Sequence, residues 1–414
     1  MIRGAEIIAA GSGLLSGIQE TNSSFLAERL TLSGINLKSI TIVGDIEEKI
    51  SDTLKNALER SDIIIIIGEL GPTGDDITRK TIAKVLGKRL ILAEEILERI
   101  KTYFMDRNRE MPKSHQRQAL IPFGAKVIEN RTGTAPGFLI EHKSSIIISL
   151  PGLPKEMRSM FLSIEPMLKD RYRSKEIKRL KIIQTCGLQE ALINEKLKDM
   201  LTHMNNSIEI GMVSTEFGVN IRIMGSGQKE EGVLDSMRLV EKKIRDRLGD
   251  YVYGTGEESL EGIIGKLLKE KGISISIAES CTGGLIAHRI TNISGSSKYF
   301  ERGVVCYSNK SKVEVLDVPA GLIKEHGSVS KEVAIAMAEG IRRMSRTEIG
   351  LSSTGIAGPT GGSAGKPIGL VYIALASPGI TNCKEYRFIS DREGIKIQTS
   401  QMALDMLRRY LINL

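Results

Sequence analysis

Four side chains that could take part in a reaction fall within one short turn of the chain. Residues 279–282 are Glu, Ser, Cys and Thr, and the glycine pair Gly283–Gly284 follows them directly. The apolar run Ile273–Ile277 before them predicts a buried strand, and Leu285–Ile293 predicts a helix. Glycines let a ligand approach the backbone, and the first N–H groups of a helix suit an anion or an oxyanion. The stretch could hold a nucleophile beside an anion site, although an ordinary strand-to-helix turn has the same outline.

Hydrolysis of a carboxamide is one reaction that these residues could support. It needs a nucleophile, a proton acceptor, an oxyanion site and an acid for the departing ammonia. None of the five histidines lies in a motif, so a serine–histidine pair is not expected. We interpret Ser280 as the nucleophile, Lys312 as its base and Tyr307 as a proton relay or orienting group. Lys312 could be neutral if burial or a neighbouring cation lowers its pKa.

Cys281 is the rival nucleophile in the same turn. A reactive cysteine needs an imidazole or another cationic partner to form its thiolate. A small residue at a buried turn more often serves packing. We therefore favour Ser280 as the nucleophile and a packing role for Cys281.

The composition limits the possible number of domains and the possible cellular location. A chain of 414 residues should hold two or three domains, and contents of 41% hydrophobic and 26% charged residues are typical of globular proteins. The sequence shows no signal peptide and no apolar run of transmembrane length, so we expect a cytoplasmic protein with no membrane partner. The four cysteines lie far apart in the sequence, which argues against a zinc ribbon or a disulfide framework.

The net charge of +8 raises the question of a nucleic-acid partner. Lys169–Lys181 contains seven basic and two acidic residues, so more than half of the excess lies in one short stretch. We interpret this stretch as a solvated linker between domains. Only 4% of the residues are aromatic, which leaves few platforms for stacked bases. A nucleic-acid partner is therefore not expected.

Alternating strands and helices in the first part of the chain predict an α/β layer fold. The run Ile63–Ile67 is wholly isoleucine, as in a parallel strand buried on both faces. Further strands are expected at 6–10, 40–43 and 146–150, and helices at about 22–32, 46–60 and from 77.

A glycine-rich loop, Gly68–Asp76, follows this isoleucine strand. Ligands bind beyond the carboxyl ends of such strands. Gly71 and its neighbours would allow a phosphate to approach the backbone, and Thr73 could donate its hydroxyl. Asp75 and Asp76 could hold a divalent cation, although Asp76 could equally cap the next helix.

Three motifs in this half, GPTGDD, TGTAPGF and PGLPKEM, resemble the amino-terminal domain of the CinA family (competence/damage-inducible protein A). That domain is similar to molybdopterin-binding proteins. The resemblance implies ADP-ribose hydrolysis with Mg²⁺, Mn²⁺ or Co²⁺, and it adds Gly133 and Thr134 to the nucleotide site. The family usually has glutamate where this chain has Gly13, and glycine where it has Glu69. Because Glu69 would repel a pyrophosphate, we expect this activity to be weak or absent.

The second half of the chain contains a small α+β unit and then a further α/β unit. Elements are expected at 182–185, 190–204, 219–224 and 234–248, with a second linker at Tyr251–Ser259. We find no reactive constellation in this small unit, and the family resemblance gives it a role in connection and dimer geometry. Beyond it, helices are expected at 260–271 and 391–410, and strands at 303–307, 349–353 and 370–376.

The motifs AESCTGG, YSNKSK and TGIAGPTGG with KPIG resemble the carboxyl-terminal domain of the same family. That domain is similar to nicotinamide-nucleotide amidases, which implies deamidation of nicotinamide mononucleotide by a serine, a lysine and a tyrosine without a metal. Glu279 is either a structural hydrogen-bond acceptor or a substrate contact. The candidate substrate-binding residues are Glu279, Thr282, Gly283, Gly284, Asn309, Gly355 and Arg392.

The sequence thus predicts an α/β multidomain chain that forms a homodimer. The expected parts are a molybdopterin-binding-like domain at 1–170, a small α+β domain at 171–253 and an amidase domain at 254–414. One alternative is a nucleotide-sensing or DNA-uptake accessory protein without catalysis. Another is a molybdopterin-handling protein, which the amino-terminal fold alone would permit. The presence of Ser280 and Lys312 together with Tyr307 favours the amidase.

Overall fold

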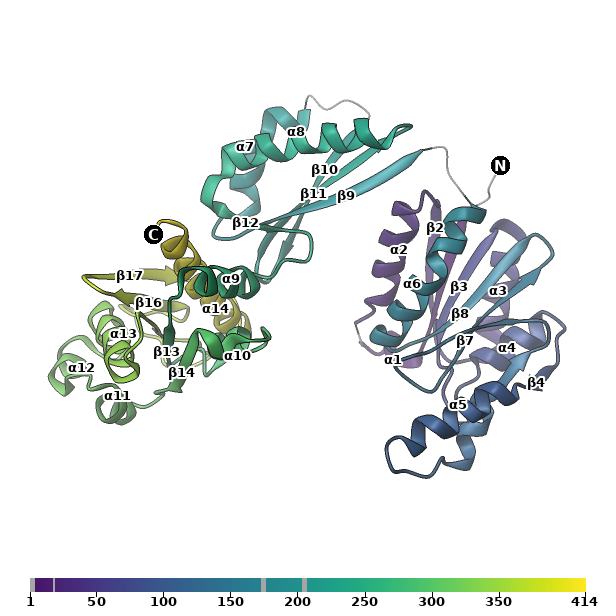
Figure 1. Cartoon of the computed structure of the whole chain (residues 1–414), viewed down its shortest axis with the longest axis horizontal. Helices are drawn as coiled ribbons and strands as arrows, with labels where there is room; N and C mark the ends of the chain where they lie inside the picture. Colours follow the sequence, from purple (N-terminus) through teal and green to yellow (C-terminus); the bar gives the residue numbers. More distant parts are fainter. Residues whose placement is uncertain (1–3, 18, 173–175, 203–206) are drawn as a thin grey trace. The chain divides into compact units, whose positions relative to one another are not determined.

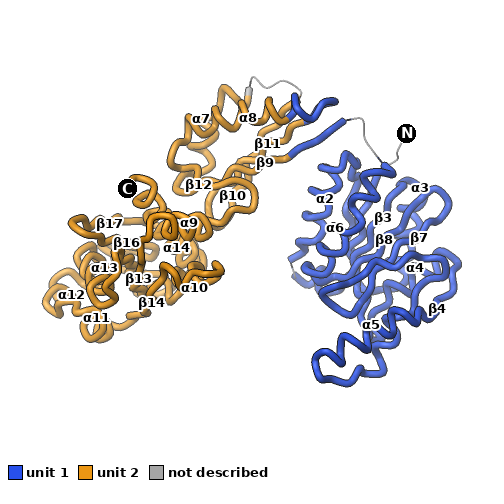
Figure 2. Tube along the Cα trace, viewed as in Figure 1, with its two compact units in different colours: residues 1–179, 226–233 blue, residues 180–225, 234–414 orange. Residues whose placement is uncertain are grey.

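The computed structural model describes residues 4–17, 19–172, 176–202 and 207–414. The chain forms two compact units (Figure 2), one with residues 1–179 and 226–233 and the other with residues 180–225 and 234–414. Within the described ranges, no helix has the length and apolar character needed to span a membrane.

A six-stranded sheet forms the centre of the first unit (Figure 1). Its strand order is β2-β1-β3-β8-β7-β6; the first four strands run parallel, and β7 and β6 are antiparallel to their neighbours. The strands are β1 (Ala5–Ala10), β2 (Leu37–Val43), β3 (Ile63–Gly68), β6 (Lys126–Ile128), β7 (Gly137–His142) and β8 (Ser145–Pro151). The isoleucine strand lies between β1 and β8 and is buried throughout, as its composition predicted.

Helices cover both faces of this sheet because successive isoleucines of β3 point to opposite sides. Ile63 and Ile65 pack with Leu26 of α2 and with side chains of α6, whereas Ile64 packs with Leu54 of α3 and with α4 and α5. The helices are α1 (Ser12–Leu15), α2 (Asn22–Leu32), α3 (Glu47–Arg60), α4 (Thr78–Val85), α5 (Glu94–Met105) and α6 (Pro154–Arg171), with a short β4 (Leu90–Leu92) and β5 (Leu120–Pro122) pair and the 3₁₀ helix η1 (Lys113–Ala119).

A four-stranded sheet of order β10-β11-β9-β12 follows in the chain. Its elements are β9 (Ile177–Thr185), α7 (Glu190–Thr202), β10 (Ile208–Thr215), β11 (Gly218–Gly227), α8 (Glu230–Leu248), the 3₁₀ helix η2 (Gly249–Tyr251) and β12 (Val252–Thr255). The end of the helix predicted to reach residue 204 lies outside the described residues.

The structure corrects both predicted linkers. Tyr251–Ser259 contains β12, which pairs antiparallel with β9 and so completes the sheet edge. Lys169–Lys181 contains the end of α6 and the start of β9, with residues 173–175 outside the described ranges. Its charges are partly neutralised, since Lys169 lies 3.1 Å from Glu165 and Arg179 lies 2.5 Å from Glu230. Sequence reasoning missed the partner of Arg179 because Glu230 comes from another element, whereas Lys169 and Glu165 lie one turn apart in α6.

The last part of the chain forms a five-stranded sheet of order β14-β13-β15-β16-β17. Strands β14, β13 and β15 run parallel, and β16 and β17 are antiparallel to their neighbours. The elements are α9 (Leu260–Lys271), β13 (Ile275–Glu279), α10 (Leu285–Thr291), the 3₁₀ helix η3 (Ser296–Lys298), β14 (Phe300–Val305), α11 (Asn309–Leu316), α12 (Ala320–His326), α13 (Lys331–Ser345), β15 (Ile349–Gly355), β16 (Leu370–Ser377), β17 (Ile380–Arg387) and α14 (Arg392–Ile412).

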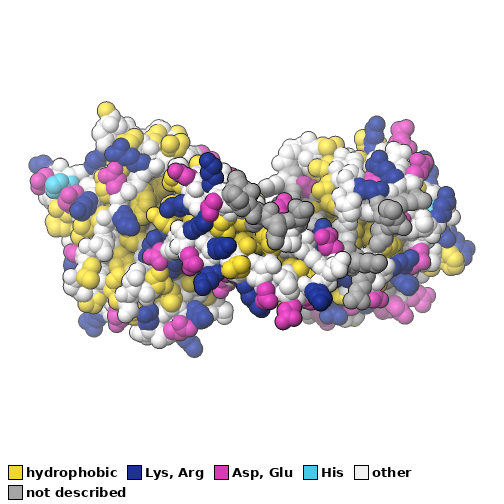
Figure 3. Space-filling model, turned by 90° about the horizontal axis from the view of Figure 1, so that it is seen from above, with side chains coloured by type: hydrophobic (Ala, Val, Ile, Leu, Met, Phe, Trp, Pro, Cys, Tyr) yellow, Lys and Arg dark blue, Asp and Glu magenta, His cyan; other side chains and the backbone are white. Residues whose placement is uncertain are grey.

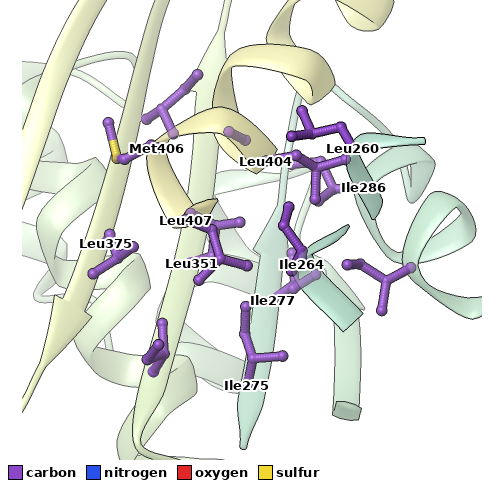
Figure 4. Packing of buried hydrophobic residues seen from close by; sticks show 14 of the residues in the cluster. Leu260, Ile264, Ile275, Ile277, Ile286, Leu351, Leu375, Leu404, Met406 and Leu407 are labelled. Carbon is purple, nitrogen blue, oxygen red and sulfur yellow. The ribbon is translucent and has the colours of Figure 1, made fainter. Parts of the chain in front are cut away.

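A large apolar cluster fixes the central strands of this sheet (Figure 4). Ile275 and Ile277 of β13 pack with Leu351 of β15 and with Leu404 and Leu407 of α14. Helices α9 and α10 contribute to the same cluster. Helix α13 instead packs in two smaller apolar clusters, one with side chains of β13 and α11 and the other with side chains of β16. The predicted α/β multidomain fold is confirmed.

Strand β13 begins two residues later than predicted and includes Glu279. Strand β14 ends at Val305 and not at Tyr307. The reactive stretch therefore starts inside the sheet, where neighbouring strands hold it on both sides.

Acidic and basic side chains are interspersed on the face in view in Figure 3. Ion pairs such as Lys84–Glu47 and Arg247–Asp199 join side chains far apart in the sequence. Charges of both signs are therefore distributed over this face.

Candidate active site

Ser280 lies directly beyond the carboxyl end of β13, the strand between β14 and β15 in the carboxyl-terminal sheet. Its backbone N–H donates to the Ser353 carbonyl of β15 over 3.0 Å. Its carbonyl accepts from the Gly283 N–H over 3.2 Å, which closes the turn. Two neighbouring segments thus fix the backbone of the expected nucleophile.

Lys312 reaches Ser280 from helix α11. Ser308 caps this helix, because its hydroxyl accepts from the Ser311 N–H. The Lys312 ammonium nitrogen, Nζ, lies 3.0 Å from Ser280 Oγ, 2.9 Å from the Cys306 carbonyl oxygen and 3.2 Å from the Tyr307 carbonyl oxygen. The side chain is only 1% exposed. The structure therefore brings the expected base to the expected nucleophile across 32 residues of sequence.

Burial lowers the pKa of Lys312, because the charged ammonium loses its hydration inside the protein. The neighbouring thiols of Cys306 and Cys281 act weakly in the opposite direction. Burial also raises the pKa of Cys281 to about 12. A thiol with such a pKa stays protonated near neutral pH, which favours the packing role for Cys281.

Glu279 binds the start of helix α10. Its carboxylate is buried and accepts from the backbone N–H groups of Gly284, Ile286 and Ala287 over 2.9, 3.1 and 2.8 Å. The carboxylate thus stabilises the positive end of the helix. The geometry is that of a structural acceptor, one of the two roles left open for Glu279. It also corrects the expectation of free N–H groups here, because Gly284 already donates to Glu279.

Thr282 is directed into the protein and not toward a cleft. Its side chain is fully buried, and its hydroxyl lies 2.7 Å from the Ser353 hydroxyl. This position argues against the predicted contact with a substrate phosphate. Gly283, in contrast, has a φ of 63° and an open side: a Cβ atom there would lie 3.7 Å from Lys396 Nζ.

Tyr307 and Arg392 form a second polar contact near this turn. Arg392 Nη2 donates to the Tyr307 hydroxyl over 2.7 Å, and Arg392 Nη1 donates to the Gly358 carbonyl over 2.6 Å. Tyr307 is 59% exposed. Its backbone carbonyl contacts Lys312, whereas its hydroxyl contacts Arg392. The predicted roles of Tyr307 and Arg392 stay predictions, but the two side chains lie together.

A cleft of about 730 Å³ opens beside this contact. Arg392 and Lys396 line it from α14, and Gly358 and Ile368 line it from the loop between β15 and β16. Sequence reasoning missed Lys396. Its spacing could have revealed it, because Lys396 lies four residues after Arg392 and residues four apart share one face of a helix.

The other two expected substrate contacts, Gly355 and Asn309, do not line this cleft. Gly355 ends β15, and a Cβ atom there would lie 2.6 Å from a Val371 side-chain carbon, which gives a packing reason for the glycine. Asn309 is exposed at the first position of α11.

Residues of the amino-terminal loop after β3 form hydrogen bonds with one another. The Asp76 carboxylate accepts from the Gly71 N–H over 2.8 Å, from the Thr73 N–H over 2.5 Å and from the Thr73 hydroxyl over 2.6 Å. These are the donors that were expected to face a phosphate. The suggested N-cap role of Asp76 is wrong, since no side chain caps α4.

Gly133 and Thr134 line a different cavity, of about 460 Å³, beside α5. The Gly133 N–H donates to the Asn130 side-chain oxygen over 2.9 Å. Neither Gly71 nor Thr73 lines this cavity. This cavity thus holds two of the four predicted nucleotide-binding residues.

The divalent-metal site at Asp75 and Asp76 stays a prediction. Donors of the loop itself occupy the Asp76 oxygens. Within the described residues, no three histidine, cysteine or acidic side chains converge to hold a metal ion. Burial and the carboxylates of Asp45, Asp76 and Asp75 raise the pKa of Glu69.

Comparison with known proteins covers the whole chain. Three family models match: the "Probable molybdopterin binding domain" at residues 6–170, the "Damage-inducible protein CinA KH domain" at 180–254 and the "CinA C-terminal domain" at 257–411. A CinA-like protein of Dictyoglomus turgidum is 44% identical over 411 residues, and one of Kosmotoga olearia is 42% identical over 412; each alignment covers 99% of both chains. The solved competence/damage inducible protein CihA of Agrobacterium tumefaciens is 41% identical over 36% of this chain and 92% of its own, with a TM-score of 0.36.

Proposed function

Because the chain belongs to the CinA family, we propose that it hydrolyses the carboxamide of nicotinamide mononucleotide to the nicotinate form and ammonia. Ser280 is the nucleophile and Lys312 is its base. The positively charged pyridinium ring of this substrate withdraws electrons from the carboxamide, which makes its carbonyl carbon more electrophilic.

One observation carries the proposal: Lys312 Nζ has three partners, Ser280 Oγ and the carbonyls of Cys306 and Tyr307. A neutral amine has two N–H groups and one lone pair. The two carbonyls can only accept, so they take the two N–H groups and leave the lone pair for the Ser280 hydroxyl proton. After proton transfer, the ammonium can donate its third N–H back to Ser280. The same contacts therefore serve both protonation states.

The reaction then follows in two balanced steps. Ser280 Oγ attacks the carboxamide carbon as its proton passes to Lys312, and Lys312 returns this proton to the nitrogen that leaves as ammonia. Water next attacks the acyl–serine ester while Lys312 accepts its proton, and the proton returns to Ser280 Oγ. Lys312 thus acts as base and acid in turn.

Two further groups complete the proposed site. The backbone N–H groups of Cys281 and Thr282 lie beside the Cys281 sulfur. No backbone carbonyl in the described chain accepts from them, so they are the candidates for the oxyanion. Arg392 and Lys396 line the adjacent cleft and are the candidate partners of the substrate phosphate. Tyr307 would hold Arg392 in position through its hydroxyl.

The deciding experiment is incubation of the full-length protein with nicotinamide mononucleotide. We expect ammonia and nicotinate mononucleotide in equal amounts, and in water labelled with ¹⁸O the label should enter the carboxylate. The variant Ser280→Ala serves as the blank. Failure of the folded protein to release ammonia would favour the alternative of a nucleotide-sensing accessory protein.

A further inference from the structure

The loop 356–369, between β15 and β16, forms one wall of the amidase cleft, with Gly358 and Ile368 among the lining residues. The ends of the loop are joined, because the Ile356 N–H donates to the Leu370 carbonyl over 2.9 Å. The KPIG motif lies in the last part of this loop. The proposed amidase chemistry gives this motif no role.

The middle of the loop has little apolar support. Residues 359–365 are all exposed, and three of them are glycines. Ile368, farther along, is 42% exposed. Glycines and exposed side chains place few restraints on the backbone of a loop. Polar contacts must therefore fix the position of this wall of the cleft.

Lys366, the first residue of the motif, supplies such contacts. Its Nζ donates to the carbonyl oxygens of His326 and Val329, over 2.5 and 2.7 Å, in the turn between α12 and α13. Both acceptors are backbone groups, so the place of the ammonium is set by the fold and not by a mobile acidic side chain. The turn comes close to it: Gly327 has a φ of 77°, and a Cβ atom there would lie 2.8 Å from Lys366 Nζ.

The turn that receives Lys366 is itself held by the central sheet. Thr354, in β15, donates from its hydroxyl to the Ser328 carbonyl over 2.8 Å. The preceding residue of the same strand, Ser353, accepts from the Ser280 N–H. The strand that fixes the proposed nucleophile therefore also fixes the turn to which the loop is attached.

A continuous set of contacts leads from Lys366 to Arg392. Pro367 restricts its own backbone and that of the residue before it, so the position of Lys366 limits the position of Ile368. The Ile368 side chain lies against Gly358, where a Cβ atom would be 2.8 Å from Ile368 Cγ2. The Gly358 carbonyl accepts from Arg392 Nη1 over 2.6 Å. The lysine thus supports the group that orients the arginine.

We propose that Lys366 is a positioning residue for phosphate recognition: it holds the loop so that the Gly358 carbonyl directs Arg392 toward the phosphate of a mononucleotide. Lys366 does not itself line the cleft. The proposal rests on the proposed function in one respect, the assignment of Arg392 to the substrate phosphate. It does not depend on the amidase reaction.

The inactive variant Ser280→Ala allows this role to be measured as binding without turnover. Full-length protein in this background would be titrated by calorimetry with nicotinamide mononucleotide and with its riboside. Adding Lys366→Met, which removes the donors but keeps an unbranched side chain, should weaken mononucleotide binding about tenfold. Riboside binding should not change, because the riboside has no phosphate. Lys331→Met, an exposed lysine at the start of α13, is the matched control and should bind both ligands as the parent does.

A double-mutant cycle shows whether Lys366 acts through Arg392. Once Arg392→Met has removed the guanidinium, Lys366→Met should have little further effect on mononucleotide binding, whereas independent contributions would add. Lys366→Arg keeps a donor at this position and should lose less affinity than Lys366→Met, again for the mononucleotide alone. This conservative variant carries the comparison if Lys366→Met does not fold, which circular dichroism would show.

The proposal is overturned if the lysine variants bind the mononucleotide as the parent does, or if they lose riboside affinity to the same degree. It is also overturned if the effects of Lys366→Met and Arg392→Met add, or if the parent does not bind the mononucleotide. The expected pattern of binding in a protein that releases no ammonia would contradict the amidase and leave the role of Lys366 in place.

Discussion

Two glycine-rich loops of this chain follow strands that have a parallel neighbour on each side, yet they use their carboxylates differently. After β13, Glu279 binds the N-terminus of α10 and leaves Ser280 beside Lys312. After β3, Asp76 binds Gly71 and Thr73, the groups that would have to face a ligand. One carboxylate supports a reactive residue, and the other occupies the expected binding groups.

The difference teaches that a loop motif shows where a site can lie but not whether its donors are free. In the carboxyl-terminal loop, the residues that surround Ser280 come from β15 and α11. In the amino-terminal loop, the contacts found for Asp76 come from the loop itself. A reactive centre needs partners from separate elements, and Ser280 has them.

The sharpest test of this contrast is removal of the nucleophile. Ser280→Ala should reduce ammonia release from nicotinamide mononucleotide by at least about 1,000-fold, because no other group can form the acyl intermediate. Cys281→Ala should retain much of the activity. The measurement is initial ammonia release, with circular dichroism to compare the folds. An active Ser280→Ala variant with an inactive Cys281→Ala variant would move the nucleophile to the cysteine.

The base can be tested through its pH dependence. Burial lowers the pKa of Lys312, and the neutral amine is the reactive form, so the rate should rise with pH with a midpoint below the ordinary lysine pKa of 10.5. Lys312→Arg should lower the rate about 100- to 10,000-fold, because a guanidinium does not release its proton. Rate–pH profiles of both proteins give the answer. An active arginine variant with an unchanged profile would show that Lys312 only binds substrate.

The amino-terminal loop should respond to a change of charge. We expect the native protein to hydrolyse ADP-ribose weakly or not at all with Mg²⁺, Mn²⁺ or Co²⁺. Glu69→Gly removes one negative charge beside the ligand. At about 4 Å and an effective dielectric near 20, that charge would cost about 4 kcal/mol before screening. If half of this cost falls on the transition state, its removal should raise the rate about thirtyfold. The double variant Glu69→Gly with Gly13→Glu tests the other departure from the family. Strong hydrolysis by the native protein would contradict the interpretation of this loop as inactive.

The smallest expected effect concerns the residue that sequence reasoning missed. Lys396→Ala should raise KM for nicotinamide mononucleotide about tenfold and change kcat little, as expected for loss of one hydrogen bond to a charged group. The riboside, which lacks the phosphate, should be insensitive to the change. Lys324→Ala, an exposed lysine outside the cleft, is the control. Equal losses for both substrates would remove Lys396 from phosphate binding.

The sequence predicted the layers of the fold better than the contacts between side chains of different elements. The β3 isoleucines and the helices at residues 22–32 and 46–60 follow from hydrophobic periodicity, which is a local property. The pairing of Lys312 with Ser280 was expected from chemistry and family resemblance. The burial of Thr282 and the place of Lys396 were not predicted, because they depend on how β15 and α14 pack around the turn.

The burial of Lys312 also has a consequence for folding stability. Below its lowered pKa the native protein must keep an ammonium ion away from water, whereas the unfolded chain hydrates it freely. This penalty disappears as the pH rises past 10.5, where both states are neutral. The uncharged variant Lys312→Met should therefore melt a few degrees higher than the native protein near neutral pH, with a gap that narrows in alkali. The residue proposed to drive the reaction is thus one that the fold would be more stable without.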